Sequence, residues 1–572
     1  MRLKAGLEIH QQLDCGKLFC ECDEFNVDDD LIFKRKLHAT SSEMGKIDIA
    51  AKSEGIREFT YFNRGCNCLV YTDEEPPRGP NKKAVDIALQ FAKLVNSTIL
   101  EEVHFMRKVV VDGSNTSGFQ RTALIATGGQ IEYEGGILEL DQICLEEDSC
   151  RHGKNKDEYL LDRLGIPLLE VTTKPQLKES KQVQLAAKAL GRLLRACRVK
   201  RGLGTIRQDV NVSINGGQRV ELKGFQDLSS MPQVVENEMI RQSNLNDLTK
   251  GKTSEPINVS EYFSKRKFAI ACKLIGWKGT LGTKKSEKNH VRMGRELADY
   301  AIKAGVKGLM HSDELPAYGI SEKETTKLHE ILECRNNDAF VLIFGEETMA
   351  KDAIRRVIER VKTEGVPKEV RRVTPENLTR YIRPMPGASR MYPETDIPPL
   401  KLKDIQITVP KTLDEREKLL PLNDEESKQM VSRNLDKRFK SLMKYCDDPK
   451  IISRILLHTL TNINSKGLPS ISDIDIATVL DLVSKKRISK EGIEEALIQI
   501  TAGQEIQLGS ENIEEEVRNY IDALIEEKIE FVREKGMSAI GPLMGPVMSE
   551  FRGKIDGAKI NALLMNRIKK EI

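Results

Sequence analysis

The chain opens with a carboxylate and an imidazole two residues apart. Glu8 and His10 lie in the short apolar segment Gly6-Leu7-Glu8-Ile9-His10. On an extended strand, side chains at positions i and i+2 leave the same face of the backbone. The segment therefore predicts one wall of a metal or phosphate site, and the other walls must come from distant parts of the chain.

Two later segments could supply further carboxylates. Glu146, Glu147 and Asp148 follow one another after an apolar run. If this segment is extended, Glu147 points to one side and its two neighbours point to the other, so only part of the triplet can face a pocket. A solvated strand end is the alternative. Glu170 stands alone in the apolar segment 165–171, where a carboxylate needs a bound cation or a basic side chain as partner.

A polar loop and a basic stretch could bind phosphate. Residues 112–120 bring Ser114, Asn115 and Gln120 together with two glycines, although they lack the spacing of a P-loop and could form an ordinary hairpin turn. Residues 180–208 contain no acid and eight basic residues, which indicates a phosphate-contacting surface or a solvated helix face. The eight are Lys181, Lys188, Arg192, Arg195, Arg198, Lys200, Arg201 and Arg207.

Two alternating segments follow the basic stretch. Arg207, Asp209 and Asn211 share one face of a predicted strand. Glu221 and Lys223 lie on a second strand that could pair with the first across the turn 215–217.

Two close cysteine pairs stand in the first 70 residues. Cys20 and Cys22 form one pair, and Cys66 and Cys68 form the other, so four thiolates could close a tetrahedral zinc site. The C-x-C spacing is shorter than the usual C-x₂₋₄-C of zinc knuckles, and small buried hydrophobic residues are the alternative. Cys15 is a substitute ligand. With 11 cysteines and no leader segment, thiols or metal ligands are expected rather than disulfides.

The composition indicates a globular protein of several domains. The 572 residues are 39% hydrophobic and 31% charged, and the net charge of +3 encodes no overall attraction to nucleic acid. We find no apolar run long enough to span a membrane and no secretion leader, so the expected compartment is the cytoplasm. Short strands dominate up to about residue 275, and charged amphipathic helices fill the last 160 residues, which predicts a multidomain α+β fold.

Five blocks in this order resemble the GatB/GatE family of tRNA-dependent amidotransferase subunits. The blocks are Gly6–His10, Leu145–Asp148, Leu164–Val171, Asp209–Ile214 and Glu221–Gly224. The resemblance implies a cradle-shaped domain that uses ATP and Mg²⁺ to phosphorylate the glutamate esterified to misacylated tRNA(Gln).

The resemblance also implies roles for individual residues. Glu8, His10, Glu147 and Glu170 are expected to converge as catalytic and Mg²⁺ ligands. Nucleotide or substrate binding is expected of Ser114, Asn115, Gln120, Arg207, Asp209, Asn211, Glu221 and Lys223.

The resemblance further implies a domain order. The cradle would span residues 1–275 and 376–410, with the segment 383–399 returning the chain to it. Residues 276–375 look like the insertion that bacterial-type aspartyl-tRNA synthetases share with the archaeal GatE branch, an inserted α/β domain expected to contact tRNA. An all-α C-terminal region would comprise a helical domain over 411–505 and a tRNA-binding tail domain over 506–572.

The resulting prediction is an ATP-dependent ligase subunit that converts Glu-tRNA(Gln) to Gln-tRNA(Gln). We find no asparaginase-like nucleophile motif, so ammonia would come from a partner, which the resemblance implies is the asparaginase-like GatD subunit. The rival hypothesis is a non-catalytic, zinc-containing RNA-binding or assembly subunit whose acidic residues are structural.

Overall fold

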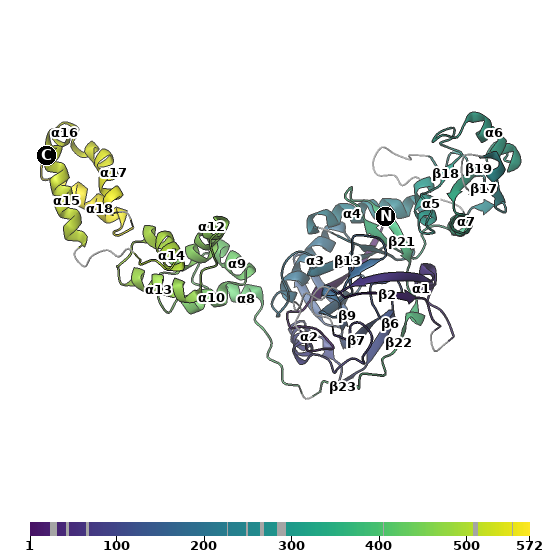
Figure 1. Ribbon diagram of the computed structural model, residues 1–572, viewed down its shortest axis with the longest axis horizontal. Coiled ribbons are helices and arrows are strands. Elements are labelled where there is room, and N and C mark those ends of the chain that lie inside the picture. The colour runs from purple at the N-terminus through teal and green to yellow at the C-terminus, as the bar shows by residue number, and fades with distance from the viewer. Residues whose placement is uncertain are drawn as a thin grey trace. The chain divides into compact units, whose positions relative to one another are not determined.

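A computed structural model divides the chain into two compact units, Met1–Pro410 and Lys411–Ile572 (Figure 1). The structure describes all residues except 23–30, 42–44, 64–67, 226, 247–249, 264–267, 283–292, 404, 507–512 and 552, and the side chains of 53 and 388. The first unit mixes helices with large sheets and the second is helical, which confirms the predicted α+β class with a helical C-terminal region. The two units meet in the sequence at the position where the helical region was expected to begin.

A 12-stranded sheet dominates the first unit, with β1 (Leu3–Gln12) near its middle. The main path runs in the order β21 (Thr379–Pro384), β20 (Glu369–Val373), β14 (Val220–Lys223), β13 (Ile206–Ile214), β1, β12 (Pro167–Thr173), β9 (Gly136–Glu147), β7 (Phe119–Thr127), β6 (Phe105–Val109) and β22 (Met391–Pro393). β4 (Thr98–Ile99) pairs with β7, and β8 (Gln130–Tyr133) pairs with β9. Neighbours along the path are antiparallel except β14 and β20, which are parallel.

One face of this sheet is apolar and packs against α2 (Lys82–Leu94), α3 (Ser180–Leu194) and α4 (Met231–Asn246). Leu7 and Ile9 of β1 belong to the same buried core as the apolar residues of these helices. The apolar residues at helical spacing along α3 and directly after it are all buried, namely Val183, Ala187, Leu190, Leu194 and Cys197. Because strand side chains alternate, Glu8 and His10 emerge on the opposite, polar face.

The two edges of the sheet are joined by a short link. β21 and β22 lie at opposite ends of the strand order, yet only residues 385–390 separate them. Ten flat strands would span about 43 Å, whereas this link covers at most about 25 Å. The sheet must therefore curve. The link ends near the polar face, because Arg390 at its end donates to the Val109 carbonyl at 2.9 Å and lies near Glu146.

A smaller sheet packs beside the loop 112–118. Its strand order is β10 (Arg151–His152), β11 (Glu158–Leu160), β3 (Arg57–Phe62) and β2 (Ile32–Leu37). Gly113 has a φ of 93°, and a Cβ there would lie 2.5 Å from ring atoms of both Phe59 and Tyr159. Only glycine fits this close approach, which seats the polar loop against the small sheet. The remaining elements of this region are α1 (Ile49–Glu54) and the pair β5 (Glu102–Val103) and β23 (Leu400–Lys401).

An inserted region carries its own sheet. β15 (Lys252–Thr253), β17 (Phe268–Ile275), β19 (Ala339–Gly345) and β18 (Met310–His311) follow in this order, and β16 (Ile257–Asn258) also pairs with β17. The helices of this region are α5 (Met293–Ile302), α6 (Glu322–Ile331) and α7 (Glu347–Lys362). The insertion was expected over 276–375, but β15 to β17 precede that range and pair within the inserted sheet, while β20 lies in the main sheet. The strand pairing therefore places both the beginning and the end of the inserted region earlier in the sequence than expected.

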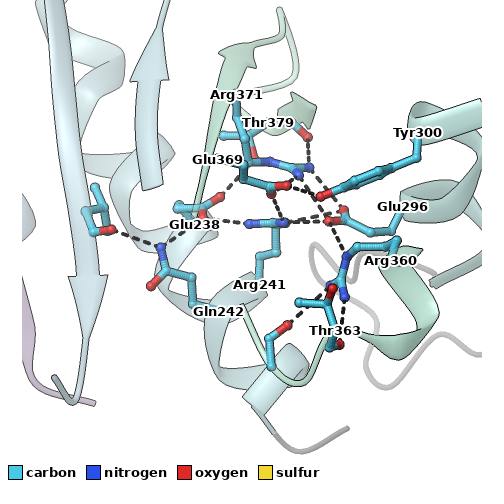
Figure 2. A network of polar contacts seen from close by, with 12 residues as sticks. Glu238, Arg241, Gln242, Glu296, Tyr300, Arg360, Thr363, Glu369, Arg371 and Thr379 are labelled. Atoms are coloured by element: carbon cyan, nitrogen blue, oxygen red, sulfur yellow. Dashed lines mark hydrogen bonds and ion pairs between the residues drawn. The ribbon is translucent and has the colours of Figure 1, made fainter. Parts of the chain in front are cut away.

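A buried ion network joins the insertion to the main sheet (Figure 2). Its charged members are Glu238, Arg241, Glu296, Arg360, Glu369 and Arg371, all at most 3% exposed. Arg241 contacts glutamates on three elements, at 2.8 Å to Glu238 and 2.6 Å to both Glu296 and Glu369. Burial would raise the pKa of Glu296, but the guanidinium groups of Arg241 and Arg371 hold it well below its usual range. The network thus fixes α4, α5 and β20 to one another.

The second unit consists of helices. They are α8 (Leu413–Lys418), α9 (Asp424–Ser432), α10 (Asp436–Leu442), α11 (Pro449–Arg454), α12 (Leu460–Ser465), α13 (Asp473–Ser484), α14 (Ile493–Thr501), α15 (Ile513–Glu527), α16 (Ile529–Lys535), α17 (Ile540–Phe551) and α18 (Gly557–Ile568). The last four share a separate apolar core. Within the described part of the chain, no helix combines the length and the apolar character needed to cross a membrane.

Candidate functional site

The middle of the polar face is built by the register of three strands. His10 of β1 lies opposite Glu170 of β12 and opposite Arg207 of β13. Glu8 lies opposite Asp209 in the same way. Directly paired residues of antiparallel strands present their side chains on one face, so these residues meet without any help from loops.

An acid cluster surrounds His10. We use this name for Glu8, Glu146 and Glu170 together with His10 and Lys108. The His10 Nε2 atom lies 3.3 Å from Glu170 Oε2, 3.7 Å from Glu8 Oε1 and 3.9 Å from Glu146 Oε2. Lys108 Nζ contacts Glu146 and lies 3.5 Å from Glu170. The structure therefore brings together three of the four predicted catalytic residues, Glu8, His10 and Glu170.

The acid cluster carries more negative than positive charge. Burial raises the pKa of Glu8 to about 7, against the lowering influence of Lys223. Burial and the neighbouring Glu170 raise the pKa of Glu146. Burial opposes ionisation of Glu170 as well, but Lys108 and His10 hold its pKa well below the usual range. For His10, burial would lower the pKa, but the surrounding carboxylates raise it to about 9.

The donor set suits a hard divalent cation. One ligand atom each from His10, Glu146 and Glu170 lies within 4.8 Å of the others, and the same holds for Glu8, His10 and Asp209. Mg²⁺ prefers carboxylate oxygens and keeps further positions for water and substrate phosphates. The raised pKa values of Glu8 and Glu146 indicate too little positive charge around these carboxylates, and a divalent cation would supply it.

The prediction that Glu147 joins this cluster is wrong. Its carboxylate lies on the opposite face of β9, where Oε1 accepts from the backbone N–H of Arg121 at 2.9 Å and lies 3.5 Å from the Arg121 guanidinium. Consecutive strand residues point to opposite faces, and Cys144, two residues before Glu146, is the partner of Glu170 in the β9–β12 register. Glu146 therefore faces the cluster and Glu147 faces away.

Asp209, Asn211, Glu221 and Lys223 extend the polar face beyond Glu8. Lys223 Nζ lies 2.5 Å from Asp209 Oδ2 and 2.6 Å from Glu221 Oε1. Asn211 lies opposite Glu221 in the β13–β14 register, and its side-chain oxygen is buried with no hydrogen-bond partner among the described residues. An acceptor in this state can receive a hydrogen bond from a ligand. These four predicted residues thus form a wall continuous with the acid cluster.

Arg207 makes a different contact. Its Nη2 lies 2.9 Å from Oδ1 of the fully buried Asp148, whose other oxygen lies 2.8 Å from Arg163. Burial would raise the pKa of Asp148, but Arg207 and Arg163 hold it below its usual value. Arg207 therefore closes one end of the polar face through Asp148, the third acid of the predicted triplet.

The polar loop contributes one residue directly to the cluster. Gln120 Nε2 donates to Glu146 Oε2 at 3.2 Å and to the carbonyl of Glu147 at 2.7 Å. Ser114 donates to its own neighbour Asp112 instead, at 2.6 Å. Asn115 is buried, and its amide lies 3.5 Å from Ser149 Oγ, just beyond β9. Ser114 and Asn115 therefore lie at the end of β9, without a described contact to the acid cluster.

One basic residue at the site, Lys108, escaped prediction from the sequence. Lys108 begins a valine-rich segment whose pattern predicts a strand, and only its pairing with Gln120 places it beside the acids. Arg390, in the returning segment 383–399, donates to the Val109 carbonyl at 2.9 Å and lies near Glu146. The one local signal was a basic residue directly before the apolar run Val109–Val111.

Three of the four predicted zinc ligands lie together. The thiols of Cys20, Cys22 and Cys68 are within 4.8 Å of one another, whereas Cys66 lies outside the described residues. Contact with the Cys20 thiol lowers the pKa of Cys68 to about 5, and the same contact together with burial raises the pKa of Cys20. A thiolate beside two further sulfurs is the donor type that Zn²⁺ prefers.

Comparison with known proteins identifies the family of this chain. The GatB/GatE catalytic domain matches residues 3–408, and the GatB domain matches residues 437–568. The E subunit of glutamyl-tRNA(Gln) amidotransferase from Thermococcus gammatolerans is 40% identical, with 99% of this chain and 98% of that protein covered. The proteins of the same name from Archaeoglobus fulgidus and Methanocaldococcus jannaschii are 40% and 41% identical over the same shares. The chain therefore belongs to the GatB/GatE family, and the acid cluster lies within the part that matches its catalytic domain.

Proposed function

We propose that this chain is the E-type subunit of an archaeal glutamyl-tRNA(Gln) amidotransferase, an ATP-dependent ligase that acts in the cytoplasm. It would bind Glu-tRNA(Gln), activate the γ-carboxylate of the esterified glutamate and form Gln-tRNA(Gln). The observation that carries this proposal is the acid cluster on the polar face of the main sheet. The names of relatives that match nearly the whole chain support it.

The chemistry requires activation because a carboxylate is a poor electrophile towards ammonia. The γ-carboxylate oxygen attacks the terminal phosphorus of ATP, the bond to the bridging oxygen breaks and ADP leaves. Ammonia then attacks the acyl phosphate, phosphate leaves with the bonding pair, and the nitrogen loses a proton to yield the amide. Phosphoryl transfer of this kind depends mainly on positioning and charge neutralisation.

The residues of the polar face have matching roles. Glu8, Glu146 and Glu170 would hold Mg²⁺, which would neutralise the phosphates of ATP. His10 orients Glu170 through their 3.3 Å contact rather than serving as a ligand, because Mg²⁺ prefers oxygen donors. Lys108 and Lys223 place positive charge beside the reacting oxygens, and Asn211 and Gln120 offer hydrogen bonds to the substrate.

The remaining parts of the chain have supporting roles in this proposal. The curved main sheet forms the cradle, and the inserted region acts as a synthetase-like domain that contacts tRNA. The tail domain binds the outer tRNA body. The asparaginase-like GatD subunit supplies ammonia, since this chain shows no nucleophile motif of its own. A structural Zn²⁺ bound by Cys20, Cys22 and Cys68, with Cys66 as the fourth ligand, would brace the start of the chain.

Formation of ADP that depends on Glu-tRNA(Gln) tests the proposal. The purified chain with its partner should release ADP only when charged tRNA is present, and Glu170→Gln should abolish the release while tRNA binding persists. Release of no ADP by the unaltered complex would favour the rival function, a non-catalytic RNA-binding or assembly subunit. Full turnover by the Glu170→Gln variant would remove this residue from the site.

A further inference from the structure

A leucine is held in open solvent at the tip of the loop between α3 and β13. Leu203 is fully exposed, at 104% of its reference area. The glycines on either side, Gly202 and Gly204, have φ values of 115° and 80°, and a Cβ at either position would meet nothing within 4 Å. An apolar side chain presented in this way adds nothing to the stability of the fold.

Both ends of this loop are anchored on β1. The side chain of Gln11, only 2% exposed, donates to the carbonyls of Lys200 at 3.1 Å and Thr205 at 3.2 Å. The backbone of Gln12 accepts from Lys200 at 3.0 Å and donates to Thr205 at 2.9 Å. A hydrogen bond from Thr205 Oγ1 to the Gly202 carbonyl, at 2.8 Å, closes the turn. These hydrogen bonds therefore hold the loop rigidly against β1, the strand that carries Glu8 and His10.

The surroundings of the loop are positively charged. No acidic residue occurs between Ser180 and Gln208, and Arg195, Arg198 and Arg201 lie close to the tip in the sequence. Arg198 lies 3.3 Å from Asp14, and the stretch 180–208 as a whole contributes eight basic residues and no acid. A partner that combines negative charge with flat apolar surfaces complements this loop, and unpaired nucleotides have both properties.

We propose that Leu203 packs against the bases of the single-stranded 3′ end of the RNA substrate, with the neighbouring arginines on its phosphates. The proposal rests on the proposed function, which brings the amino acid at that end to the acid cluster. Arg207 lies opposite His10, and four residues of chain place Leu203 within about 14 Å of this position. The terminal nucleotides would pass the loop on their way to the site.

Binding of two RNAs by the full chain with its partner tests this contact. The RNAs are uncharged tRNA(Gln) and the same tRNA without its single-stranded 3′ end. Leu203→Ala should weaken binding of the intact tRNA about 5- to 20-fold, because one apolar contact with a base is lost. The same variant should bind the truncated tRNA as the unaltered protein does. Ile137→Ala is a matched control, since Ile137 is 55% exposed beside two glycines in a hairpin but has acidic neighbours.

Unchanged binding of the intact tRNA by Leu203→Ala would overturn the proposal, and so would equal weakening for both RNAs. In either case tRNA-dependent ADP release by the unaltered protein would leave the proposed function standing. If the unaltered protein bound neither RNA, both the proposed contact at Leu203 and the proposed function would be wrong. Because the fully exposed Leu203 side chain has no packing to lose, the melting temperature of the variant should match that of the unaltered protein.

Discussion

The acid cluster and the ion network of Figure 2 each contain three glutamates, but they differ in how those charges are balanced. In the network, Glu238, Glu296 and Glu369 meet the guanidinium groups of Arg241, Arg360 and Arg371. In the acid cluster, the three glutamates share Lys108 and His10. The network has one guanidinium group for each glutamate, whereas the acid cluster has three carboxylates for two basic side chains.

The pKa values follow this difference. The network arginines overcome the effect of burial and lower the pKa of Glu296. In the acid cluster, Lys108 and His10 lower the pKa of Glu170, but burial prevails at Glu8 and Glu146 and raises theirs. A buried pair that is matched holds elements together, and breaking it is costly. A buried set with unbalanced charge favours a ligand that restores the balance. The comparison thus separates a structural cluster from a functional one by charge balance, which composition alone does not reveal.

The largest expected effect is on catalysis at the acid cluster. Glu146→Gln should lower tRNA-dependent ADP formation at least about 1,000-fold, because it removes a charged group that faces the reacting phosphate. The melting temperature should not fall, since the change also relieves repulsion from Glu170. Glu139→Gln, on the exposed end of the same strand, is the control. Full ADP formation by Glu146→Gln would contradict the assignment.

The next effect is on stability at the network. Glu296→Gln should reduce the free energy of unfolding by about 3–5 kcal/mol, because Arg241 and Arg371 lose a fully buried partner. Urea unfolding measures this change. The exposed pair Glu347 and Lys351 on α7 provides the control, since Glu347→Gln should cost less than about 1 kcal/mol. Equal losses for the two variants would show that the network does not stabilise the fold.

Metal binding should distinguish the two neighbouring glutamates of β9. Mg²⁺ at 100 times its dissociation constant should stabilise the protein by about 2.7 kcal/mol. We expect Glu146→Gln to lose most of this stabilisation and Glu147→Gln to keep it, because Glu147 faces Arg121 on the other side of the strand. Thermal melting with and without Mg²⁺ measures both. The opposite result would restore the original prediction for Glu147.

The smallest expected effect is a change in stability at acidic pH. The pKa of Glu296 is lowered in the folded protein, so its contribution to stability is present above the unfolded value of about 4.5 and is lost as the pH falls towards the folded value. The stability difference between unaltered protein and Glu296→Gln should therefore shrink below pH 4.5, by up to about 1.4 kcal/mol per pH unit. A urea series from about pH 5 to about pH 3 measures it. A constant difference would mean that Glu296 has the same pKa in the folded and the unfolded protein.

The sequence alone determines the features that depend on local periodicity. The two-residue repeat of a strand places Glu8 with His10, and Asp209 with Asn211, before any tertiary contact is known. The apolar stripe of α3 and the helical C-terminal region follow from the same kind of pattern. The five ordered blocks were enough to identify the family, which the comparisons confirm.

The tertiary structure alone decides which distant residues share a face. The choice between Glu146 and Glu147 depends on a strand register, in which a shift of one residue exchanges the two faces. Lys108 reaches the acids only through the pairing of β6 with β7, and Arg241 meets Glu369 across 128 residues of sequence. Such pairings arise from long-range packing of strands and helices, so no local pattern of residue types encodes them.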